Sequence, residues 1–299
     1  MNFVHLNVHS HYSKGWGVGT IEELCQAARD RGINKLALTD TNGLYGLVFF
    51  VQTAREMGIE PIVGSEILAN GRRGLLLVKT QRGYANLSRI ISARHCDQDF
   101  DLIRSLREKR EGLIVLSDDF KLLKALKHDS LKDLFVEMSP GFQMASCYAF
   151  SRKTNIPPVA TNRVYLINKD QFRLHLTLRA VSLNSKISRL TRDATCREHN
   201  FLSPSRDMID QFPHAPAAIS NTRKIAESCL SDWDLNRIVF TCFANMGDSD
   251  AFDRLYQATL KGCQQRYGTI TRAVKGRVEQ EMRIIREKNF AHYFLVVAD

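Results

Sequence analysis

Apolar and polar positions alternate in blocks along the first 166 residues. Seven short segments are apolar and rich in leucine or β-branched residues, which is typical of strands that are buried on both faces. They lie near residues 3–9, 35–40, 60–68, 74–80, 112–117, 134–138 and 157–166. Segments with helical spacing of apolar positions, such as 44–57 and 119–128, separate them. Repeated strand–helix alternation predicts an α/β barrel or a doubly wound sheet.

Helix boundaries are marked by residues that cap helices. Thr20 and Glu23 have the spacing of a capping box, and Gly32 is placed to end the helix that they begin. From about residue 168 the strand signals fade, and residues 170–185 predict a helix. The stretch 186–215 is basic and polar and is typical of a loop-rich connection. Helices are then expected near 216–230, 249–267 and 271–289, and the final YFLVVAD predicts a strand start without a partner, as in a fragment.

Composition restricts the class of protein. The 299 residues include 44% hydrophobic ones, enough for a substantial core, and no apolar run approaches the ~18 residues of a membrane span. No secretory signal is visible at the N-terminus. The seven cysteines are scattered, without a Cys-x-x-Cys pair, which favours reduced thiols in the cytoplasm over a disulfide framework or structural zinc.

The net charge of +10 favours a polyanionic partner such as DNA, although it also serves simple solubility. Candidates for contact with the nucleic-acid backbone lie in two basic clusters, for which a solvated helix face is the alternative interpretation. They are Lys186, Arg189, Arg192, Arg272, Lys275 and Arg277.

Ionisable residues follow three of the predicted strands. His9, Asp40 and Glu66 come at the ends of the first three strands, and such ends meet at one rim when strands alternate with helices. Imidazole and carboxylate groups at one rim are what a metal-assisted phosphoester hydrolase needs.

The segments FVHLNVHSHYS, KLALTDTNGLYG and EPIVGSE carry a family resemblance. Together with RGYANLSRIIS, EGLIVLS, PPVATNRVYL and EQEMRIIREKNFAHYFLVVAD, they resemble the N-terminal PHP (polymerase and histidinol phosphatase) domain region of bacterial DNA polymerase III alpha subunits. The resemblance implies a distorted seven-stranded (β/α) barrel of PHP type followed by a helical extension. It divides the chain into a barrel core (1–185), a basic connection with the helical extension (186–270) and the start of a polymerase palm (271–299), truncated before the palm's catalytic motifs.

Several positions at which the resemblance implies metal ligands hold other residues. These positions are Asn7, Trp16, Thr41, Arg163 and Tyr165. The remaining candidate ligands are His9, His11, Asp40, Glu66 and Asp119, with Asp118 as the alternative alignment of the last. On a strand His9 and His11 would point the same way and could share a metal, or both could make ordinary hydrogen bonds. We expect Arg163 to pair with Glu66 or Asp40 and to replace the metal's charge.

The leading hypothesis is therefore a structural, scaffolding PHP portion of a polymerase III alpha-like subunit in DNA replication. Its metal site is degenerate, no cofactor is bound tightly, and no residue is catalytic, because the palm carboxylates of a DNA-directed DNA polymerase (a nucleotidyltransferase) are not in the chain. Its partners would be the remainder of the polymerase, other replisome subunits and, through salt-sensitive contacts, DNA. One alternative is a metal-dependent phosphoesterase or 3′–5′ exonuclease using Zn²⁺ or Mn²⁺. A second alternative is a non-catalytic binding module for polymerase subunits.

Overall fold

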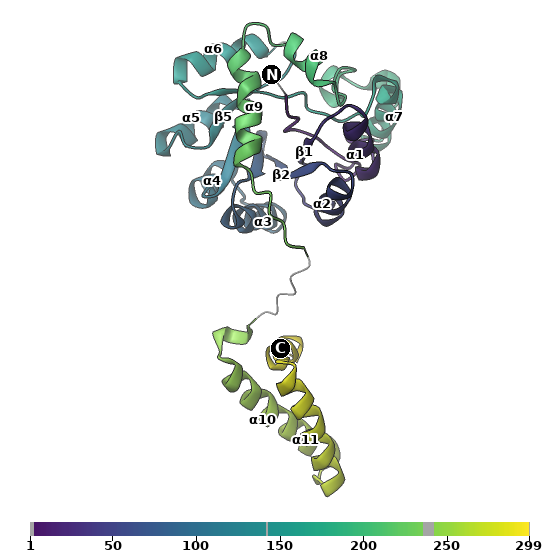
Figure 1. Cartoon of the computed structure of the whole chain (residues 1–299), viewed down its shortest axis with the longest axis vertical. Coiled ribbons are helices and arrows are strands. Elements are labelled where there is room, and N and C mark those ends of the chain that lie inside the picture. The colour runs from purple at the N-terminus through teal and green to yellow at the C-terminus, as the bar shows by residue number, and fades with distance from the viewer. Residues whose placement is uncertain (1–2, 142, 236–241, 299) are drawn as a thin grey trace. The chain divides into compact units, whose positions relative to one another are not determined.

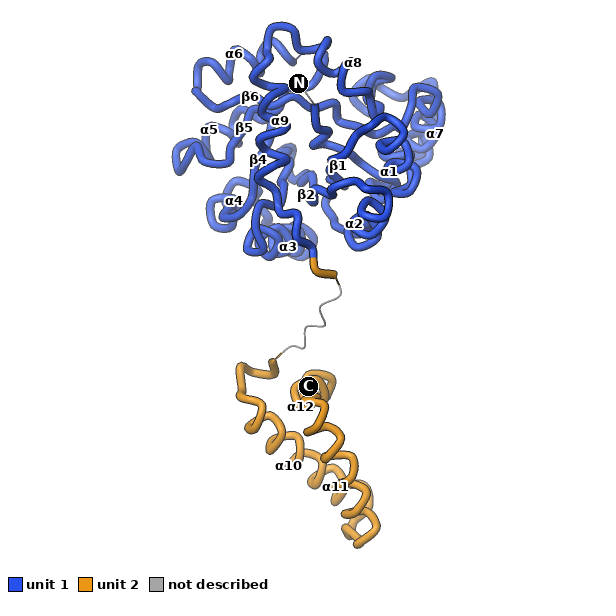
Figure 2. The backbone as a smooth tube through the Cα atoms, in the orientation of Figure 1, with its two compact units in different colours: residues 1–233 blue, residues 234–299 orange. Residues whose placement is uncertain are grey.

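The computed structural model describes residues 3–141, 143–235 and 242–298. The chain forms two compact units, residues 1–233 and 234–299 (Figure 2), and each is described by itself. The division follows contacts within the chain. It does not test the domain boundaries predicted after residues 185 and 270, which stay predictions.

The first unit is an α/β fold around one curled sheet (Figure 1). Its six strands are hydrogen-bonded in chain order: β1 (Lys35–Leu38), β2 (Glu60–Ala69), β3 (Arg72–Val78), β4 (Leu113–Ser117), β5 (Leu134–Met138) and β6 (Pro158–Ala160). The helices are α1 (Ile21–Asp30), α2 (Leu47–Glu56), α3 (Gln81–Cys96), α4 (Leu102–Lys109), α5 (Phe120–Asp129), α6 (Met144–Thr154), α7 (Phe172–Ser182), α8 (Ser205–Asp210) and α9 (Pro216–Ser228). The predicted capping box at the start of α1 is present, with Thr20 and Glu23 each bonding the other's backbone N–H.

The strand–helix alternation fails once, between β2 and β3. These strands form an antiparallel hairpin in which Ala69 pairs with Arg72 across a two-residue turn. The turn residues, Asn70 and Gly71, have φ angles of 49° and 71°, and Asn-Gly is the sequence that such a turn favours. β3 is also antiparallel to β4, whereas β1–β2, β4–β5 and β5–β6 are parallel. The amino end of β3 therefore lies at the rim where β2 and β4 end.

The predicted first strand, residues 3–9, is not a regular strand. It makes isolated bridges instead, from His5 to Leu36 on one side and from Val8 to Val164 on the other. Backbone bonds extend this pairing: the N–H of Thr39 donates to Val8 O at 2.8 Å, and the N–H of His9 donates to Val164 O at 2.8 Å. The segment thus links β1 to the chain that follows β6, and the predicted seventh strand, 157–166, is regular only over Pro158–Ala160.

One apolar cluster of the core lies on one face of the sheet and includes residues of α9. Alternate residues of the strands share one apolar cluster with Val4 and Leu6 of the first segment and with Ile225 and Ala226 of α9. The strand members are Ala37, Ile62, Leu75, Leu77, Ile114, Leu116 and Val159. Since side chains alternate along a strand, this cluster defines which positions face inward.

The second unit contains α10 (Asp248–Tyr267), α11 (Arg272–Glu287) and α12 (Ala291–Ala298). Its core includes Leu255, Val278, Met282 and Leu295. The prediction of a strand in YFLVVAD is wrong, because these residues belong to α12. Ala291 and Leu295, four positions apart, lie on one face of that helix in the shared core, and this packing outweighs the strand preference of the two valines.

Candidate functional site

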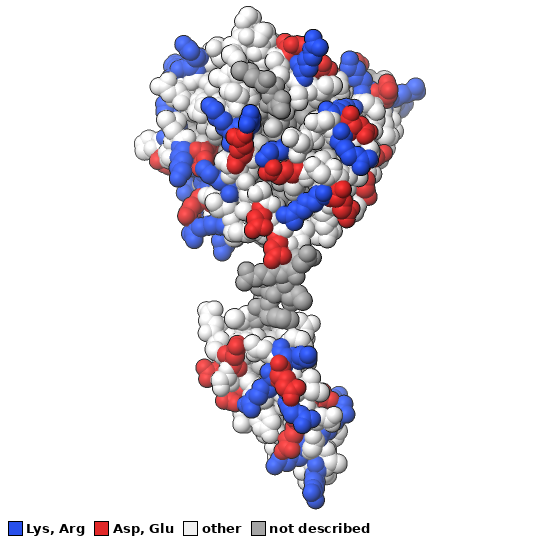
Figure 3. Space-filling model, in the orientation of Figure 1, with Lys and Arg blue, Asp and Glu red and all other residues white. Residues whose placement is uncertain are grey.

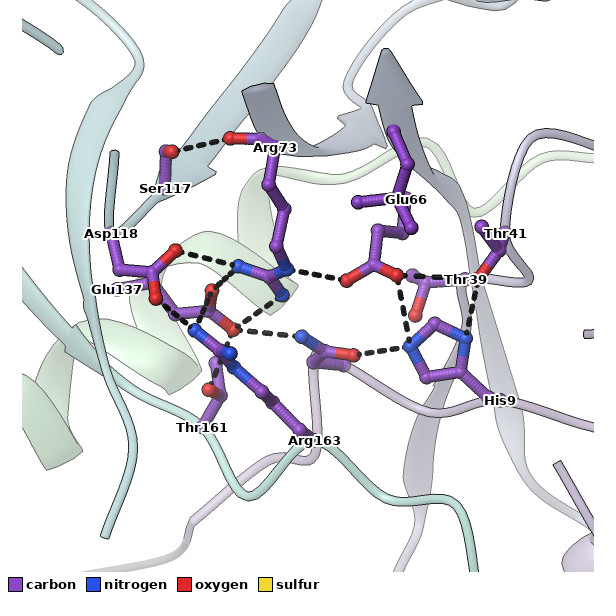
Figure 4. Close-up of polar contacts among 12 residues, drawn as sticks. His9, Thr39, Thr41, Glu66, Arg73, Ser117, Asp118, Glu137, Thr161 and Arg163 are labelled. Carbon is purple, nitrogen blue, oxygen red and sulfur yellow. Dashed lines mark hydrogen bonds and ion pairs between the residues drawn. The ribbon is translucent and has the colours of Figure 1, made fainter. Parts of the chain in front are cut away.

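A cluster of polar side chains lies at the rim of the sheet, on the same face as the apolar core residues of the strands. Each of its members lies two or four positions from an apolar core residue of the same strand or strand extension, and so points the same way. The members are Glu66 on β2, Arg73 on β3, Asp118 after β4, Glu137 on β5, and Thr161 and Arg163 after β6. Figure 4 shows their side chains converging.

Arg73 is at the centre of this cluster (Figure 4). Its Nε donates to Glu66 Oε1 at 2.6 Å, and its Nη1 donates to Asp118 Oδ1 at 3.2 Å. Nη1 also makes a short bond to Glu137 Oε2, and Nη2 lies 3.4 Å from Glu137 Oε1. One guanidinium group therefore joins carboxylates from three segments of the sheet.

Arg163 provides a second cation beside the first. Its Nη2 makes a short bond to Asp118 Oδ2 and lies 3.5 Å from Glu137 Oε2. The prediction that it would pair with Glu66 or Asp40 is wrong, because Arg73 already holds Glu66, and Asp40 points elsewhere. Arg163 has a φ angle of 47°, a conformation that is uncommon outside glycine, asparagine and aspartate.

Glu137 is completely buried and has a full set of donors. Its Oε1 accepts from Asn7 Nδ2 and from Thr161 Oγ1, both at 2.7 Å. With the bonds from the two arginines, both oxygens are engaged. A buried carboxylate with this many donors stays ionised.

The electrostatics of the cluster follow from these contacts. Burial alone would raise the pKa of Glu66, Asp118 and Glu137, but the two guanidinium groups outweigh it and hold all three pKa values below their usual range. Burial acts to lower the pKa of Arg73, yet the carboxylates of Glu137, Glu66 and Asp118 raise it well above its ordinary value. The cluster is therefore a set of five charged groups, two cations and three anions.

His9 lies at the edge of this cluster with both ring nitrogens engaged. Nε2 lies 2.9 Å from Asn7 Oδ1, and Nδ1 lies 2.9 Å from Ser13 Oγ. Because the amide of Asn7 donates through Nδ2 to Glu137, its oxygen faces Nε2 of the imidazole. Burial lowers the pKa of His9, against the opposing carboxylates of Glu66 and Asp40.

Three predicted ligands lie outside the cluster. His11 is exposed beyond the first segment, so it does not share a direction with the buried His9. Asp40 is buried but accepts from Ser10 N, Ser10 Oγ and Ser13 Oγ, each at 2.7 Å, and so fixes the loop that follows His9.

Asp119 belongs to the opposite face of β4. It caps α5 by accepting from the N–H groups of Lys121 and Leu122, and it pairs with Arg72 at 2.9 Å. The neighbouring residue, Asp118, is the one that enters the cluster, as in the alternative alignment. The alternation of side chains along a strand explains the difference between the two aspartates.

The other positions predicted to have lost ligands surround the cluster. Thr41 Oγ1 lies 3.2 Å from Glu66 Oε2, and the ring of Tyr165 stacks on that of His9 with centroids 4.4 Å apart. Trp16 lies against Tyr165, at 5.4 Å between centroids. Burial raises the pKa of the Tyr165 hydroxyl.

A cavity of about 740 Å³ opens above the cluster. Glu66, Arg73, Arg163 and Tyr165 are among the residues that line it. Two further segments form its walls, 139–143, of which residue 142 is not described, and 192–200. The second of these contributes Arg192 and Arg197, so arginines outnumber the acidic residues, Glu66 and Asp193, in the lining.

The residues present do not fit a metal ion at the base of this cavity. A metal needs free carboxylate oxygens and an imidazole lone pair. Here guanidinium groups occupy the space between Glu66, Asp118 and Glu137, and both nitrogens of His9 are bonded. Within the described ranges, no three His, Cys, Asp or Glu side chains are grouped so that they could hold a metal.

Arg73, Asp118 and Glu137 were absent from the predicted set or given only as an alternative. The strand pattern contained the signal for two of them. Asp118 and Glu137 lie two positions after Leu116 and Phe135, so their side chains point to the same face of the sheet. The Asn70–Gly71 pair would have revealed that β3 reverses direction and brings Arg73 to the rim.

The basic candidates for DNA contact lie in both units. Lys186, Arg189 and Arg192 are exposed after α7, whereas Lys275 and Arg277 on α11 pair with Glu279 and Glu281 at 3.9 and 2.6 Å. On the face in Figure 3, acidic side chains are interspersed among the basic ones in each unit. Among the described helices, none is long and apolar enough to cross a membrane.

Known proteins resemble this chain over its whole length. Residues 5–137 match the model of the PHP domain family. The chain is 29% identical to the error-prone DNA polymerase of Symbiobacterium thermophilum and 28% identical to the DNA polymerase III subunit alpha of Bacillus subtilis; both alignments cover 100% of the chain. It spans 32% and 29% of the lengths of these relatives, about a third.

Solved structures give weaker matches. A two-domain protein from Bacteroides vulgatus that contains a predicted PHP-like metal-dependent phosphoesterase has a TM-score of 0.44 and 12% identity, over 70% of this chain and 62% of its own. A protein from Bifidobacterium adolescentis described as a metal-dependent phosphoesterase has a TM-score of 0.38 and 14% identity, over 54% and 86%. The sequence comparisons carry the assignment: the chain contains a PHP domain and is homologous to the N-terminal part of DNA polymerase III alpha subunits.

Proposed function

We propose that the PHP domain of this chain is a structural part of a DNA polymerase III alpha-type protein and does not hydrolyse phosphoesters. Its role is to support the assembly of a replicative polymerase, with the former metal charges supplied by two arginines. The remainder of the polymerase and other replisome subunits are its proposed partners, and the cytoplasm is the proposed location.

The observation that carries this proposal is the position of Arg73. Its guanidinium contacts Glu66, Asp118 and Glu137 at once, so the carboxylates that a metal would require already have a permanent cation. Arg163 supplies a second cation to Asp118 and Glu137. An arginine remains protonated at any pH at which the protein is folded, so the carboxylates are not released for a metal.

The competing function is metal-dependent phosphoester or 3′–5′ exonucleolytic hydrolysis. The cavity lined by Glu66 and Tyr165 favours it, since a substrate would need such a space. It requires Zn²⁺ or Mn²⁺ to displace Arg73 and Arg163 from buried carboxylates, which would leave the guanidinium groups without partners. Removing one partner from a buried ion pair costs about 3–5 kcal/mol, and this favours the structural role.

Metal analysis of the whole purified chain tests the proposal. After incubation with Mn²⁺ or Zn²⁺ and gel filtration, we expect far less than one equivalent of metal and no hydrolysis of bis-p-nitrophenyl phosphate or of a 3′-labelled single strand. The double variant His9→Ala, Glu66→Ala is the control. It distinguishes hydrolysis at this site, which the variant would abolish, from hydrolysis by a contaminating enzyme, which it would not change. Stoichiometric metal with turnover that this variant abolishes would establish the hydrolase instead.

A further inference from the structure

Two side chains of α7 fasten one wall of the cavity. The wall segment is residues 192–197, here called the strap, and it carries Arg192 and Arg197 at the cavity lining. His175 and Arg179 lie one helical turn apart on α7 and both are buried. Each of them bonds the strap and also the turn that contains Gly15 and Trp16.

Arg179 makes the first connection between α7, the strap and the turn, through a side chain that stays charged near neutral pH. Its Nε donates to Ala194 O in the strap at 2.6 Å, and its Nη1 donates to Gly15 O at 3.2 Å. The guanidinium also lies over the ring of Trp16, 4.0 Å from the centroid. The strap is thereby connected to Trp16, which also lines the cavity.

His175 makes the second connection between α7, the strap and the turn. The hydrogen-bond partners of its ring fix its protonation state. Nδ1 lies 2.8 Å from Trp16 O, and a carbonyl oxygen only accepts, so Nδ1 carries a proton. Nε2 lies 2.9 Å from Cys196 N, and a backbone N–H only donates, so Nε2 is bare. The ring is therefore neutral, in the Nδ1–H form, whenever both bonds exist.

We propose that His175 is a pH-sensitive latch that holds the Cys196 end of the strap against α7 and releases this end when the imidazole is protonated. A proton on Nε2 would point at the N–H of Cys196, so that two donors would face each other in a buried place. The strap bond would then break while the bond to Trp16 remains. The proposal is independent of the proposed function, because it concerns access to the cavity and no metal.

The surroundings of His175 set the pH at which this occurs. Burial lowers the pKa of His175, the bond to Trp16 O acts against this, and Arg179 lowers it further. The titratable or charged groups that face the ring among the described residues are Arg179 on α7, Tyr165 after β6 and the thiol of Cys196 in the strap. Burial raises the pKa of that thiol to about 12, and the pKa of Tyr165 is raised too, so neither changes charge near neutrality. The Cys196 end of the strap should therefore stay attached at neutral pH and be released below the ordinary histidine pKa of about 6.5, while Arg179 continues to hold Ala194.

Histidine NMR and Trp16 fluorescence test the latch. In the ¹⁵N-histidine-labelled full chain at pH 7.5, His175 should show the Nδ1–H tautomer, and an Nε2–H tautomer would overturn the proposal without any mutation. In a Trp233→Phe background Trp16 is the single tryptophan. Quenching of its fluorescence by acrylamide should increase as the pH falls from 7.5 to 5. His175→Gln, whose amide oxygen can accept from Cys196 N, should abolish that rise.

Two control variants distinguish release of the strap by His175 from a general loosening of the structure at acid pH. His199→Gln removes a histidine that lines the cavity and should leave the rise in quenching unchanged. Arg179→Met should increase quenching at every pH and move the midpoint to higher pH, because the charge of Arg179 lowers the pKa of His175. If His175→Gln keeps the wild-type midpoint, or if hydrogen exchange at Cys196 does not increase together with the quenching, the latch is wrong.

Discussion

Arg73 and Glu137 lie on strands that are not neighbours, and the guanidinium of Arg73 reaches across β4 to contact both carboxylate oxygens of Glu137. The same group bonds Glu66 on β2, on the other side of Arg73. One side chain therefore connects β2, β3 and β5 at the rim of the sheet. The stability of this rim should depend on Arg73 more than on any single pair of strands.

Arg73→Met should destabilise the chain by about 3–5 kcal/mol, since it leaves three buried carboxylates with one cation. The matched control is its neighbour, Arg72→Met. Arg72 faces the other way and pairs with Asp119 in a partly exposed position, where about 1 kcal/mol or less is expected. Urea unfolding followed by circular dichroism measures both variants. Equal losses for the two arginines would contradict the role assigned to Arg73.

Stability should fall as the pH is lowered into the acid range. The folded-state pKa values of Glu66, Asp118 and Glu137 are below those of the unfolded chain. Their contribution is thus fully present above the unfolded pKa of about 4 and is lost as the pH falls further, because the unfolded chain then binds more protons. Urea midpoints at pH 7, 5, 4 and 3 test this for wild type and Arg73→Met. The variant should lose less stability between pH 5 and 3 than the wild type does.

Restoring the five predicted ligands should not be enough to restore metal binding. Asn7→His, Trp16→Asp, Thr41→His, Arg163→Asp and Tyr165→His leave Arg73 between Glu66 and Glu137. Adding Arg73→His removes that cation and supplies an imidazole. Calorimetric titration with Zn²⁺ should give binding only for the six-fold variant. Tight binding by the five-fold variant would show that Arg73 does not exclude metal.

DNA binding, if it occurs, should be electrostatic and weakened by salt. A variant with Lys186, Arg189 and Arg192 changed to glutamine should reduce the slope of log K against log salt by up to about 3, one for each lost phosphate contact. The control changes Lys275 and Arg277, which already pair with glutamates on α11. Fluorescence anisotropy with a labelled duplex at 50 and 200 mM salt measures both. Salt-independent binding would rule out this mode.

Gly71→Ala should destabilise the first unit by about 1 kcal/mol or more, since its φ angle of 71° is unfavourable for other residues and an added Cβ meets nothing. The control is Gly276→Ala, in the interior of α11, where an added Cβ also meets nothing. There alanine should stabilise the helix by up to about 1 kcal/mol. Thermal unfolding of the full chain, with hydrogen exchange to assign each transition, distinguishes the two.

Much of the fold was accessible from local sequence signals. The strand pattern located five of the six strands closely, and the Thr20–Glu23 pair gave the start of α1. The reversal of β3 was missed because the pattern was interpreted as uniform alternation. The extent of regular pairing around residues 3–9 and 161–166 depends on non-local bridges, which no local pattern encodes.

The structure brings some of the candidate site residues together, for a related reason. Glu66 and His9 lie side by side at the rim, where each follows directly from its strand. Asp40 and Asp119 lie outside the cluster, because being close to the end of a strand does not say which face a side chain occupies. The contacts of Arg73 could not be predicted until the direction of β3 was known. That direction brings its guanidinium group to the rim, where it occupies the carboxylates.

The turn at Asn70–Gly71 has a consequence for the accuracy of folding. The turn decides which of the two arginines of β3, Arg72 or Arg73, faces the carboxylates, because side chains alternate along a strand. A shift by one residue that brought Arg72 to the carboxylates would also put Gly74 in the place of Leu75 in the core. The two residues of the turn and the glycine of the strand therefore select the native pairing together. A single insertion in the turn would set these two signals against each other: Arg73 would turn outward, and the core would lose a leucine side chain.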